Sequence, residues 1–227
     1  MLFVKFAGCL LVALGSLLGA ARAEDANAAM ARLLKGKSVT LIMPVFSQLV
    51  RTSYPEGFVP GFEKAQPNYL LELVPSGETV NNWTQMFTVT GVKGLASQPE
   101  VTAKLFLDRV AQGFKRACPS SYSSQILSED KISGFDAFAA VISCGVSPST
   151  GGKTSETALI VAIKGQAGLY TIQWAQRASP SAVPIPIDPK KWTTLYKKMG
   201  PIALCPIIAG EKAPYPSCTG SGTKAAG

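Results

Sequence analysis

The chain has 227 residues, none of them histidine, and its 22 lysines and arginines outnumber its 14 acidic residues, which gives a formal net charge of +8. The absence of histidine excludes serine and cysteine hydrolases whose general base is imidazole, and it excludes zinc sites that contain histidine. The basic excess favours anionic partners. The basic residues are scattered, however, and no nucleic-acid partner is expected.

The N-terminal segment has the pattern of a secretory signal peptide. Lys5 gives it a charged start, residues 6–20 carry no charge, and Ala21-Arg22-Ala23 supplies the small residues that a signal peptidase needs. Its apolar run of about 15 residues is shorter than the roughly 20 that span a bilayer as a helix. We therefore expect residues 1–23 to be cleaved, a mature protein that is periplasmic or secreted, and no transmembrane segment after cleavage.

The first part of the mature chain predicts one short helix and several strands. Residues 26–35 are typical of a helix that ends at Gly36. Apolar and β-branched runs predict strands at residues 39–43, 48–54, 69–74 and 83–90. In the last strand an apolar set that includes Trp83 and Phe87 alternates with a threonine-rich set, which predicts one buried and one exposed face.

A longer helix is predicted over residues 98–117. Ser97 and Glu100 match a capping box at its start, and Pro119 ends it. Apolar residues recur at steps of three and four, which gives a stripe that we expect to be core packing. The stripe is made of Ala103, Phe106, Leu107, Val110, Phe114 and Ala117.

Short β-branched or aromatic runs follow, separated by glycine and serine. They predict an antiparallel series of strands at residues 121–127, 135–144, 158–164 and 169–174. After a proline-rich, extended connection at residues 180–186, Asp188 and Pro189 have the residue types that begin a helix. This helix places Trp192, Leu195, Tyr196 and Met199 on one face and ends at Gly200.

Four cysteines remain after the signal: Cys118, Cys144, Cys205 and Cys218. An even number in an exported chain predicts disulfides. Three pairings are possible, and we favour Cys118–Cys144 with Cys205–Cys218 because each closes a short loop. The expected fold is a single disulfide-stapled α+β domain over residues 24–205, with at least two helices packed on an antiparallel sheet. A disulfide-anchored tail rich in proline, glycine and serine follows at residues 206–227.

The sequence contains no complete catalytic or cofactor motif. Residues 151–154 end like a phosphate-binding loop, but Ser147 stands where the loop needs its first glycine, and a strand follows. A flexible hairpin tip is the simpler interpretation. Ser128 and Lys131 have the spacing of a Ser/Lys dyad, but we place them in a polar turn, where nothing would lower the lysine pKa. No catalytic residue, metal site or cofactor is predicted, and a pair of carboxylates that meet only in space stays open.

One turn combines polar side chains with a tryptophan. The turn at residues 77–83 and the strand after it provide a candidate binding surface, made of Glu78, Asn81, Asn82, Trp83 and Gln85. The alternative interpretation is a strand entry with a core tryptophan.

Two segments resemble known proteins. Residues 53–58, Ser-Tyr-Pro-Glu-Gly-Phe, precede strands, a capped helix and further antiparallel strands, and this order resembles the PsbP-like α/β/α sandwich over about residues 39–200. Residues 75–91 are similar to a segment of exported proteobacterial proteins of unknown function. The first resemblance implies an accessory or adaptor module without catalytic residues.

These observations lead to a functional expectation with two alternatives. We expect a non-enzymatic exported binding or accessory module, whose partner is an anionic cell-envelope component or another exported protein. The first alternative is an enzyme that uses acidic or Ser/Lys residues. The second is a secreted factor that acts on a host or a competitor.

Overall fold

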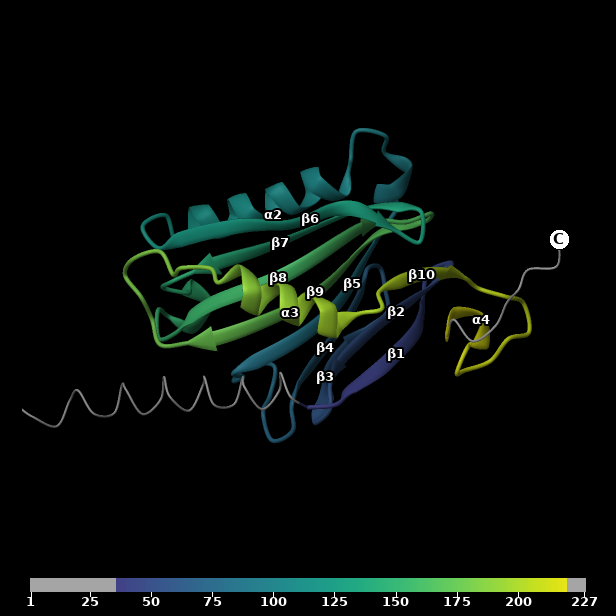
Figure 1. Ribbon diagram of the computed structural model, residues 1–227, viewed down its shortest axis with the longest axis horizontal. Helices are drawn as coiled ribbons and strands as arrows, with labels where there is room; N and C mark the ends of the chain where they lie inside the picture. Colours follow the sequence, from purple (N-terminus) through teal and green to yellow (C-terminus); the bar gives the residue numbers. More distant parts are fainter. Residues whose placement is uncertain (1–35, 220–227) are drawn as a thin grey trace, which may run out of the picture.

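The computed structural model describes residues 36–219 (Figure 1). The expected signal, the helix predicted at residues 26–35 and residues 220–227 of the predicted tail lie outside the described residues. Within them, no helix is long and apolar enough to cross a membrane. The division of the chain at residues 23 and 205 stays a prediction.

Strands dominate the described chain. They are β1 (Ser38–Val45), β2 (Gln48–Pro55), β3 (Phe58–Lys64), β4 (Tyr69–Pro75), β5 (Gln85–Lys93), β6 (Tyr122–Ile132), β7 (Phe135–Cys144), β8 (Ser155–Lys164), β9 (Gly168–Ala178) and β10 (Ala203–Pro206). The helices are α2 (Ala103–Ala117), α3 (Pro189–Met199) and α4 (Pro216–Thr219), with 3-10 turns η1 (Leu95–Ser97) and η2 (Pro148–Thr150).

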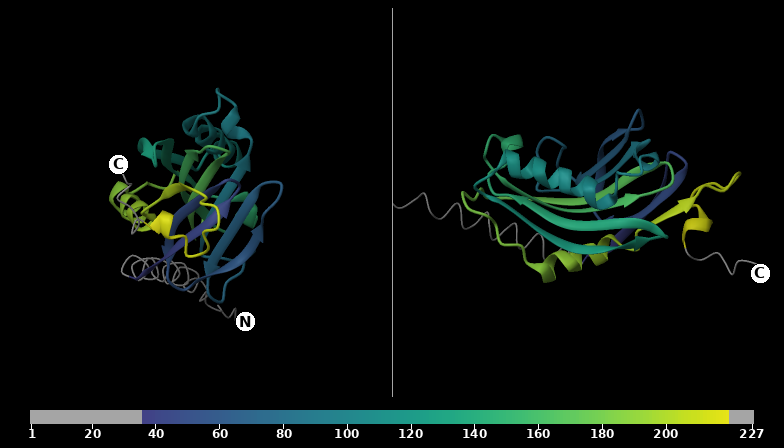
Figure 2. Two further views of the ribbon diagram at one scale, coloured as in Figure 1. Left: turned by 90° about the vertical axis from the view of Figure 1, so that its right-hand side faces the viewer. Right: turned by 90° about the horizontal axis from the view of Figure 1, so that it is seen from above.

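The strands form two antiparallel sheets. The larger sheet has seven strands in the order β3-β4-β5-β9-β8-β7-β6, and the smaller sheet has the order β1-β2-β10. Helix α2 covers one face of the larger sheet, whereas α3 and the smaller sheet cover the other face (Figures 1 and 2). The predicted α+β class with an antiparallel sheet and packed helices is confirmed.

The core has two parts, one on each face of the seven-stranded sheet. Trp174, Phe87 and Tyr170 lie on the side of α3, and Leu107 and Ile160 lie on the side of α2. The prediction that one face of residues 83–90 is exposed to solvent is therefore wrong. Thr88 is only 7% exposed, because β5 lies inside the sheet, between β4 and β9, and layers cover both of its sides.

Helix α2 begins later than predicted. Thr102 is its N-cap and accepts a hydrogen bond from the backbone N–H of Leu105, so the predicted capping box of Ser97 and Glu100 does not form. Ser97 ends η1 instead, and its hydroxyl donates to the Gly94 carbonyl. The physical reason is Pro99, because a proline keeps the residue before it in an extended conformation rather than a helical one.

The predicted apolar stripe of α2 is buried only in part. Ala103 and Leu107 are fully buried, but Phe106, Val110 and Phe114 are half-buried. The stripe is buried against the sheet near Leu107, whereas in the C-terminal half of the helix part of it is exposed to solvent. The expectation that Phe114 is enclosed in the core is therefore wrong.

The second half of the chain follows the prediction closely. Strands β6 to β9 form the expected antiparallel series, and Asp188 caps α3, whose predicted face packs on the core. Ser128 and Lys131 lie within β6, so their assignment to a turn is wrong. Two strands were not predicted: β3, an edge strand whose register shifts after Pro60, and β10.

The cysteines pair as predicted. Cys118 bonds to Cys144 and Cys205 bonds to Cys218, and both pairs have a Cα–Cα distance of 5.7 Å. The second bridge holds the C-terminal segment against the smaller sheet, where Arg51 Nη1 donates to the Cys218 carbonyl at 3.0 Å.

Candidate binding groove beside helix α2

A groove of about 440 Å³ lies between the C-terminal half of α2 and the end of the β7–β8 hairpin, and it is open to solvent. We call it the hairpin groove. Its lining is mostly apolar, with one acidic side chain. It is lined by Val110, Gly113, Phe114 and Ala117 of α2, by Cys144, by Ser147, Pro148 and Ser149, and by Glu156 of β8.

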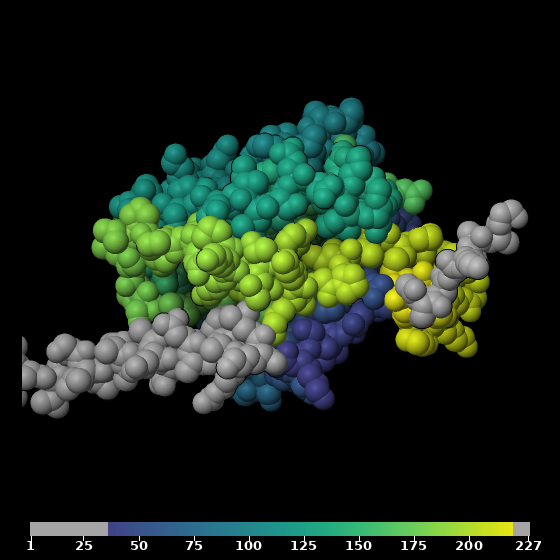
Figure 3. All heavy atoms as spheres, in the orientation of Figure 1, coloured from purple at the N-terminus to yellow at the C-terminus, as the bar shows by residue number. Residues whose placement is uncertain are grey.

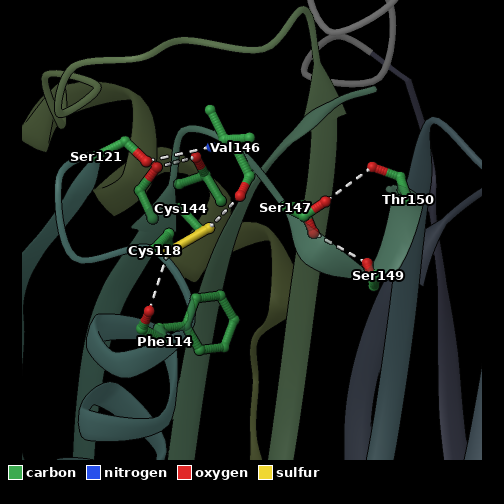
Figure 4. The surroundings of a disulfide bond; sticks show 10 residues. Phe114, Cys118, Ser121, Cys144, Val146, Ser147, Ser149 and Thr150 are labelled. Atoms are coloured by element: carbon green, nitrogen blue, oxygen red, sulfur yellow. Dashed lines mark hydrogen bonds between the residues drawn. A yellow bond between two sulfur atoms is a disulfide. The ribbon is translucent and has the colours of Figure 1, made fainter. Parts of the chain in front are cut away.

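The hairpin side of the groove is a hydrogen-bonded turn. The Ser147 backbone N–H donates to the Thr154 carbonyl at 2.8 Å. The Thr150 hydroxyl donates to the Ser147 carbonyl at 3.1 Å, and the hydroxyls of Ser147 and Ser149 lie 2.9 Å apart (Figure 4). The predicted hairpin tip at residues 151–154 is confirmed in position, and residues 147–150 form a wall rather than a phosphate cradle.

The first disulfide closes one end of the groove. Cys118 directly follows α2 and Cys144 ends β7, so their bond joins the helix to the sheet beside Phe114 (Figure 4). Next to it, the backbone N–H of Val146 donates to the Ser121 hydroxyl at 3.2 Å. The bridge thus fixes the distance between the two walls.

Gly113 leaves a vacancy in the helical wall. It lies inside α2, and a Cβ atom built on it would meet no heavy atom within 4 Å. Glycine in a helix interior costs about 1 kcal/mol relative to alanine. A close neighbour often explains such a glycine, but here there is none. The absence of a side chain at Gly113 therefore makes the groove wider between Val110 and Ala117.

An ion pair forms the polar end of the groove. Arg177 Nε lies 3.3 Å from Glu156 Oε2, and the two side chains are only 11% and 15% exposed. Arg177 Nη2 also donates to the Ser149 hydroxyl at 3.3 Å. The guanidinium lies 3.7 Å from the centre of the Trp83 ring, close enough for a cation–π interaction. Arg177 therefore connects three segments of the chain.

Exposed basic residues border the groove. Arg109 and Arg116 are exposed on α2, four residues before and three residues after Gly113, which places them on its helical row. Lys153 is exposed at the hairpin tip. The only acid that lines the groove, Glu156, is neutralised by Arg177. The groove is therefore apolar inside and basic at its border.

The structure separates the residues of the predicted binding surface. Trp83 is 7% exposed under Arg177, and Gln85 is buried and accepts a 2.8 Å hydrogen bond from an indole N–H in the core. Glu78 accepts two hydrogen bonds from Thr84 at 2.6 and 2.7 Å, so it shapes the loop. Asn81 and Asn82 are exposed. As a binding surface the set stays a prediction, and only Trp83 connects to the groove.

The Ser/Lys dyad lacks its geometry. Ser128 pairs in register with Ala139, and Lys131 pairs with Asp136, so the two side chains lie on opposite faces of the sheet. Lys131 Nζ binds the Asp136 carboxylate at 2.8 Å, and each side chain is 66% exposed. Among residues 36–219 no cluster of three or more metal-ligating side chains occurs.

The sequence has no close match. No family model matches the chain, and no curated protein matches it significantly. Among solved structures, the Ran-binding protein Mog1p of Saccharomyces cerevisiae is 10% identical over 71% of this chain and 91% of its own, with a TM-score of 0.41. LpqN, involved in cell envelope biogenesis of Mycobacterium tuberculosis, is 11% identical over 77% of this chain and 95% of its own, with a TM-score of 0.35.

A protein from Bacteroides thetaiotaomicron is 17% identical over 78% of this chain and 50% of its own, with a TM-score of 0.35. None of the three proteins is PsbP, and the resemblance of this chain to the PsbP-like sandwich stays a prediction. With TM-scores below 0.5, they carry nothing about partners or activity to this chain.

Proposed function

We propose that this protein is a non-enzymatic exported binding module that holds apolar side chains of a partner protein in the hairpin groove. The observation that carries the proposal is Gly113. The helix gives up about 1 kcal/mol at this position without gaining a packing contact. Since no packing contact explains this glycine, we infer that it serves to keep the groove open.

The shape of the groove favours a protein over a small molecule. Sites for small ligands enclose about 70–90% of the ligand surface, whereas this groove is open to solvent. A macromolecule that covers the groove would bury its apolar lining completely. Protein interfaces combine such an apolar centre with a polar border. The hairpin groove has both, because Val110 and Phe114 lie inside it and arginines flank it.

The border determines the charge of the partner. Arg109, Arg116 and Lys153 would be placed next to the partner's surface, and Arg177 already neutralises the acid in the groove. Charge complementarity favours a partner whose apolar side chains are flanked by aspartate or glutamate. The signal pattern and the two disulfides support export of this protein. We therefore propose that the partner is another exported protein with acidic residues around its apolar side chains. Recovery from the periplasm or medium of a protein that begins at Glu24 tests the export.

Synthetic peptides test the groove directly. The first peptide contains leucine and phenylalanine flanked by aspartate and glutamate, the second has lysine at the acidic positions, and dodecanoate represents an acyl ligand. We expect the acidic peptide to bind at least ten times more tightly than the basic one. Gly113→Leu, which fills the groove, should abolish this binding. Gln112→Leu is the matched control, because Gln112 adjoins Gly113 but lines the other side of α2.

Three results would overturn the proposal. Equal binding of both peptides would exclude a contribution of the basic border to binding. Equal effects of Gly113→Leu and Gln112→Leu would show that the peptide does not bind in the hairpin groove. If dodecanoate bound and neither peptide did, the ligands of the groove would be acyl chains of the cell envelope. Acidic-peptide binding that only Gly113→Leu removes would support a protein partner.

A further inference from the structure

The two edge strands of the seven-stranded sheet differ in how they are protected against pairing with another strand. Proteins protect such edges with proline, charged side chains or β-bulges. Strand β3, at one edge, contains Pro60 with a register shift beside it and ends in Glu63 and Lys64. Strand β6, at the other edge, has its register shift and its charged residues only after Ile126. The first half of β6, residues 122–126, therefore has none of these protective features.

The outer backbone groups of residues 122–126 are available for hydrogen bonds. Their inner side pairs with β7, and among residues 36–219 no other backbone group bonds to them. The proline-rich connection comes close, because the Ser123 hydroxyl donates to the Ile185 carbonyl at 2.7 Å. Tyr122 packs on the α2 side of the sheet, so Ser123 points to the α3 side. This contact thus lies beneath the strand and not along its edge. Figure 3 shows β6 in teal at the front of the molecule, above α3.

A groove of about 300 Å³ lies between this edge and helix α2. We call it the β6 groove. Ser124, Gln125 and Ile126 all line it, and neighbouring side chains of a strand point to opposite faces, so the groove reaches the backbone of β6. Ala140 of β7 pairs in register with Ile126 and also lines the groove. Because Ala140 and Ala111 of α2 are small, the space between helix and sheet stays open here.

The charges in the β6 groove favour a partner with an acidic residue. Its two charged lining residues are Asp108 and Lys115. Asp108 forms an ion pair with Lys104 at 2.8 Å, whereas Lys115 has no ion pair among residues 36–219. Lys115 lies toward the Tyr122 end of the groove, because only residues 118–121 connect α2 to β6. An acidic side chain of a bound segment would meet Lys115 there.

We propose that the edge of β6 binds an extended segment of another polypeptide as an additional strand, with alternate apolar side chains in the β6 groove. Strand addition gives affinity through main-chain hydrogen bonds and specificity through pockets for alternate side chains. Asp108 and Lys115 are about 10 Å apart along α2, and alternate side chains of a strand are about 7 Å apart, so the groove accepts two of them. Binding would also cover Ile126, which is 59% exposed.

Two other occupants fit this edge less well. A small molecule would fill the groove but would leave the outer backbone groups of β6 without partners. A second copy of this chain would bring its own β6, which has Ser124 between Tyr122 and Ile126 on the face that enters the groove, where an apolar side chain is required. The proposal does not depend on the hairpin groove, which lies on the other side of α2.

Titration of the purified protein with peptides tests strand addition. The probe is a capped peptide, Thr-Val-Thr-Val-Thr-Asp-Thr, whose valines and aspartate lie on one face when it is extended. One N-methylated version carries its methyl groups on the amides of the threonines, and another carries them on the amides of the valines and the aspartate. Alternate amides of an added strand point to the same neighbour. One version should therefore lose about ten-fold or more in affinity, and the other should keep it.

Two leucine variants of α2 test the groove. Ala111→Leu fills the β6 groove and should weaken binding of the peptide by about ten-fold or more. Gly113→Leu fills the hairpin groove and should leave this affinity unchanged. The opposite pattern is expected for the acidic peptide of the hairpin groove, so failure of one proposal can be distinguished from failure of the other.

A charge variant tests the same site without filling it. Lys115→Gln should weaken the peptide about five-fold and should leave unchanged the affinity of a version with asparagine in place of the aspartate. Arg116→Gln is the matched control, because Arg116 is also exposed at the end of α2 but does not line the β6 groove. It should change neither affinity.

The results divide clearly. Loss of binding in Ala111→Leu but not in Gly113→Leu, with one inactive N-methylated version and slower hydrogen exchange at residues 122–126, would support strand addition. Equal binding of the two N-methylated versions would overturn it, because a peptide held by its side chains alone is not an added strand. A protein that sediments as a dimer without peptide and as a monomer after Ala111→Leu would also overturn it, because a second copy would then occupy the edge.

Discussion

Replacing Gly113 with alanine should stabilise the protein and weaken binding at the same time. The helical backbone accepts alanine, and the new Cβ meets nothing within 4 Å, so the gain is the helix-propensity difference of about 1 kcal/mol. For a domain of this size, that gain raises the melting temperature by about 2–4 °C. Thermal unfolding followed by circular dichroism measures the shift, and peptide titration measures the weaker binding.

Gly145→Ala supplies the opposite case in the same chain. A Cβ on Gly145 would collide with the Ser181 carbonyl oxygen and would lie 2.7 Å from the Ser121 Cβ. Because a backbone oxygen cannot move cheaply, we expect a loss of about 1–3 kcal/mol. If Gly113→Ala lowered the melting temperature as Gly145→Ala does, Gly113 would be a packing glycine. Gly113 would then have no role in keeping the groove open.

Three further predictions concern stability. Arg177→Met should lower the free energy of unfolding by about 3 kcal/mol, because it leaves the mostly buried Glu156 carboxylate unpaired. Lys104→Met breaks an exposed ion pair and should lower it by less than about 1 kcal/mol. Denaturant titration measures both values, and equal losses would contradict the burial of the first pair. Burial raises the pKa of Glu72 above 4.5 in the folded protein, so the folded state binds more protons and stability falls as the pH rises above this value. Glu72→Gln should therefore raise the melting temperature at about pH 7 but not at about pH 3, and an equal change at both would refute the cause. Changing both Cys205 and Cys218 to alanine should cost about 3 kcal/mol, and an unchanged unfolding midpoint would show that the bridge does not stabilise the fold.

Local patterns predicted most of the fold. The strands at residues 135–144 and 158–164 were found because β-branched runs between turn residues have few other structures available, and α3 was found because Asp188 and Pro189 precede a periodic apolar face. Strand β3 was missed because Pro60 interrupts it, and β10 was missed because it has only four residues. The capping-box pattern of Ser97 and Glu100 does not predict the start of α2 correctly, because Pro99 holds Gln98 in an extended conformation.

The groove could be predicted only in part. Gly113 in the middle of a periodic helix was the available signal, but a sequence does not show whether a neighbour fills the position. The ion pair of Glu156 and Arg177 follows from the register of β8 and β9, in which the two residues are directly opposite. That register depends on where each strand ends, and strand ends are poorly defined by composition. The contact of Arg177 with Trp83 joins segments too distant for any local pattern.

The smaller sheet has a consequence for the order in which the protein folds. Its central strand, β2, pairs with β1 through a tight connection but receives its other neighbour, β10, from the far end of the domain. The hydrogen bond from Arg51 to Cys218 joins positions 167 residues apart. Contacts of such sequence separation form late, because the loop entropy is lost before they contribute. During synthesis, therefore, β2 keeps an unpaired edge until residues 203–206 are available, and a chain interrupted before them would expose that edge to other chains.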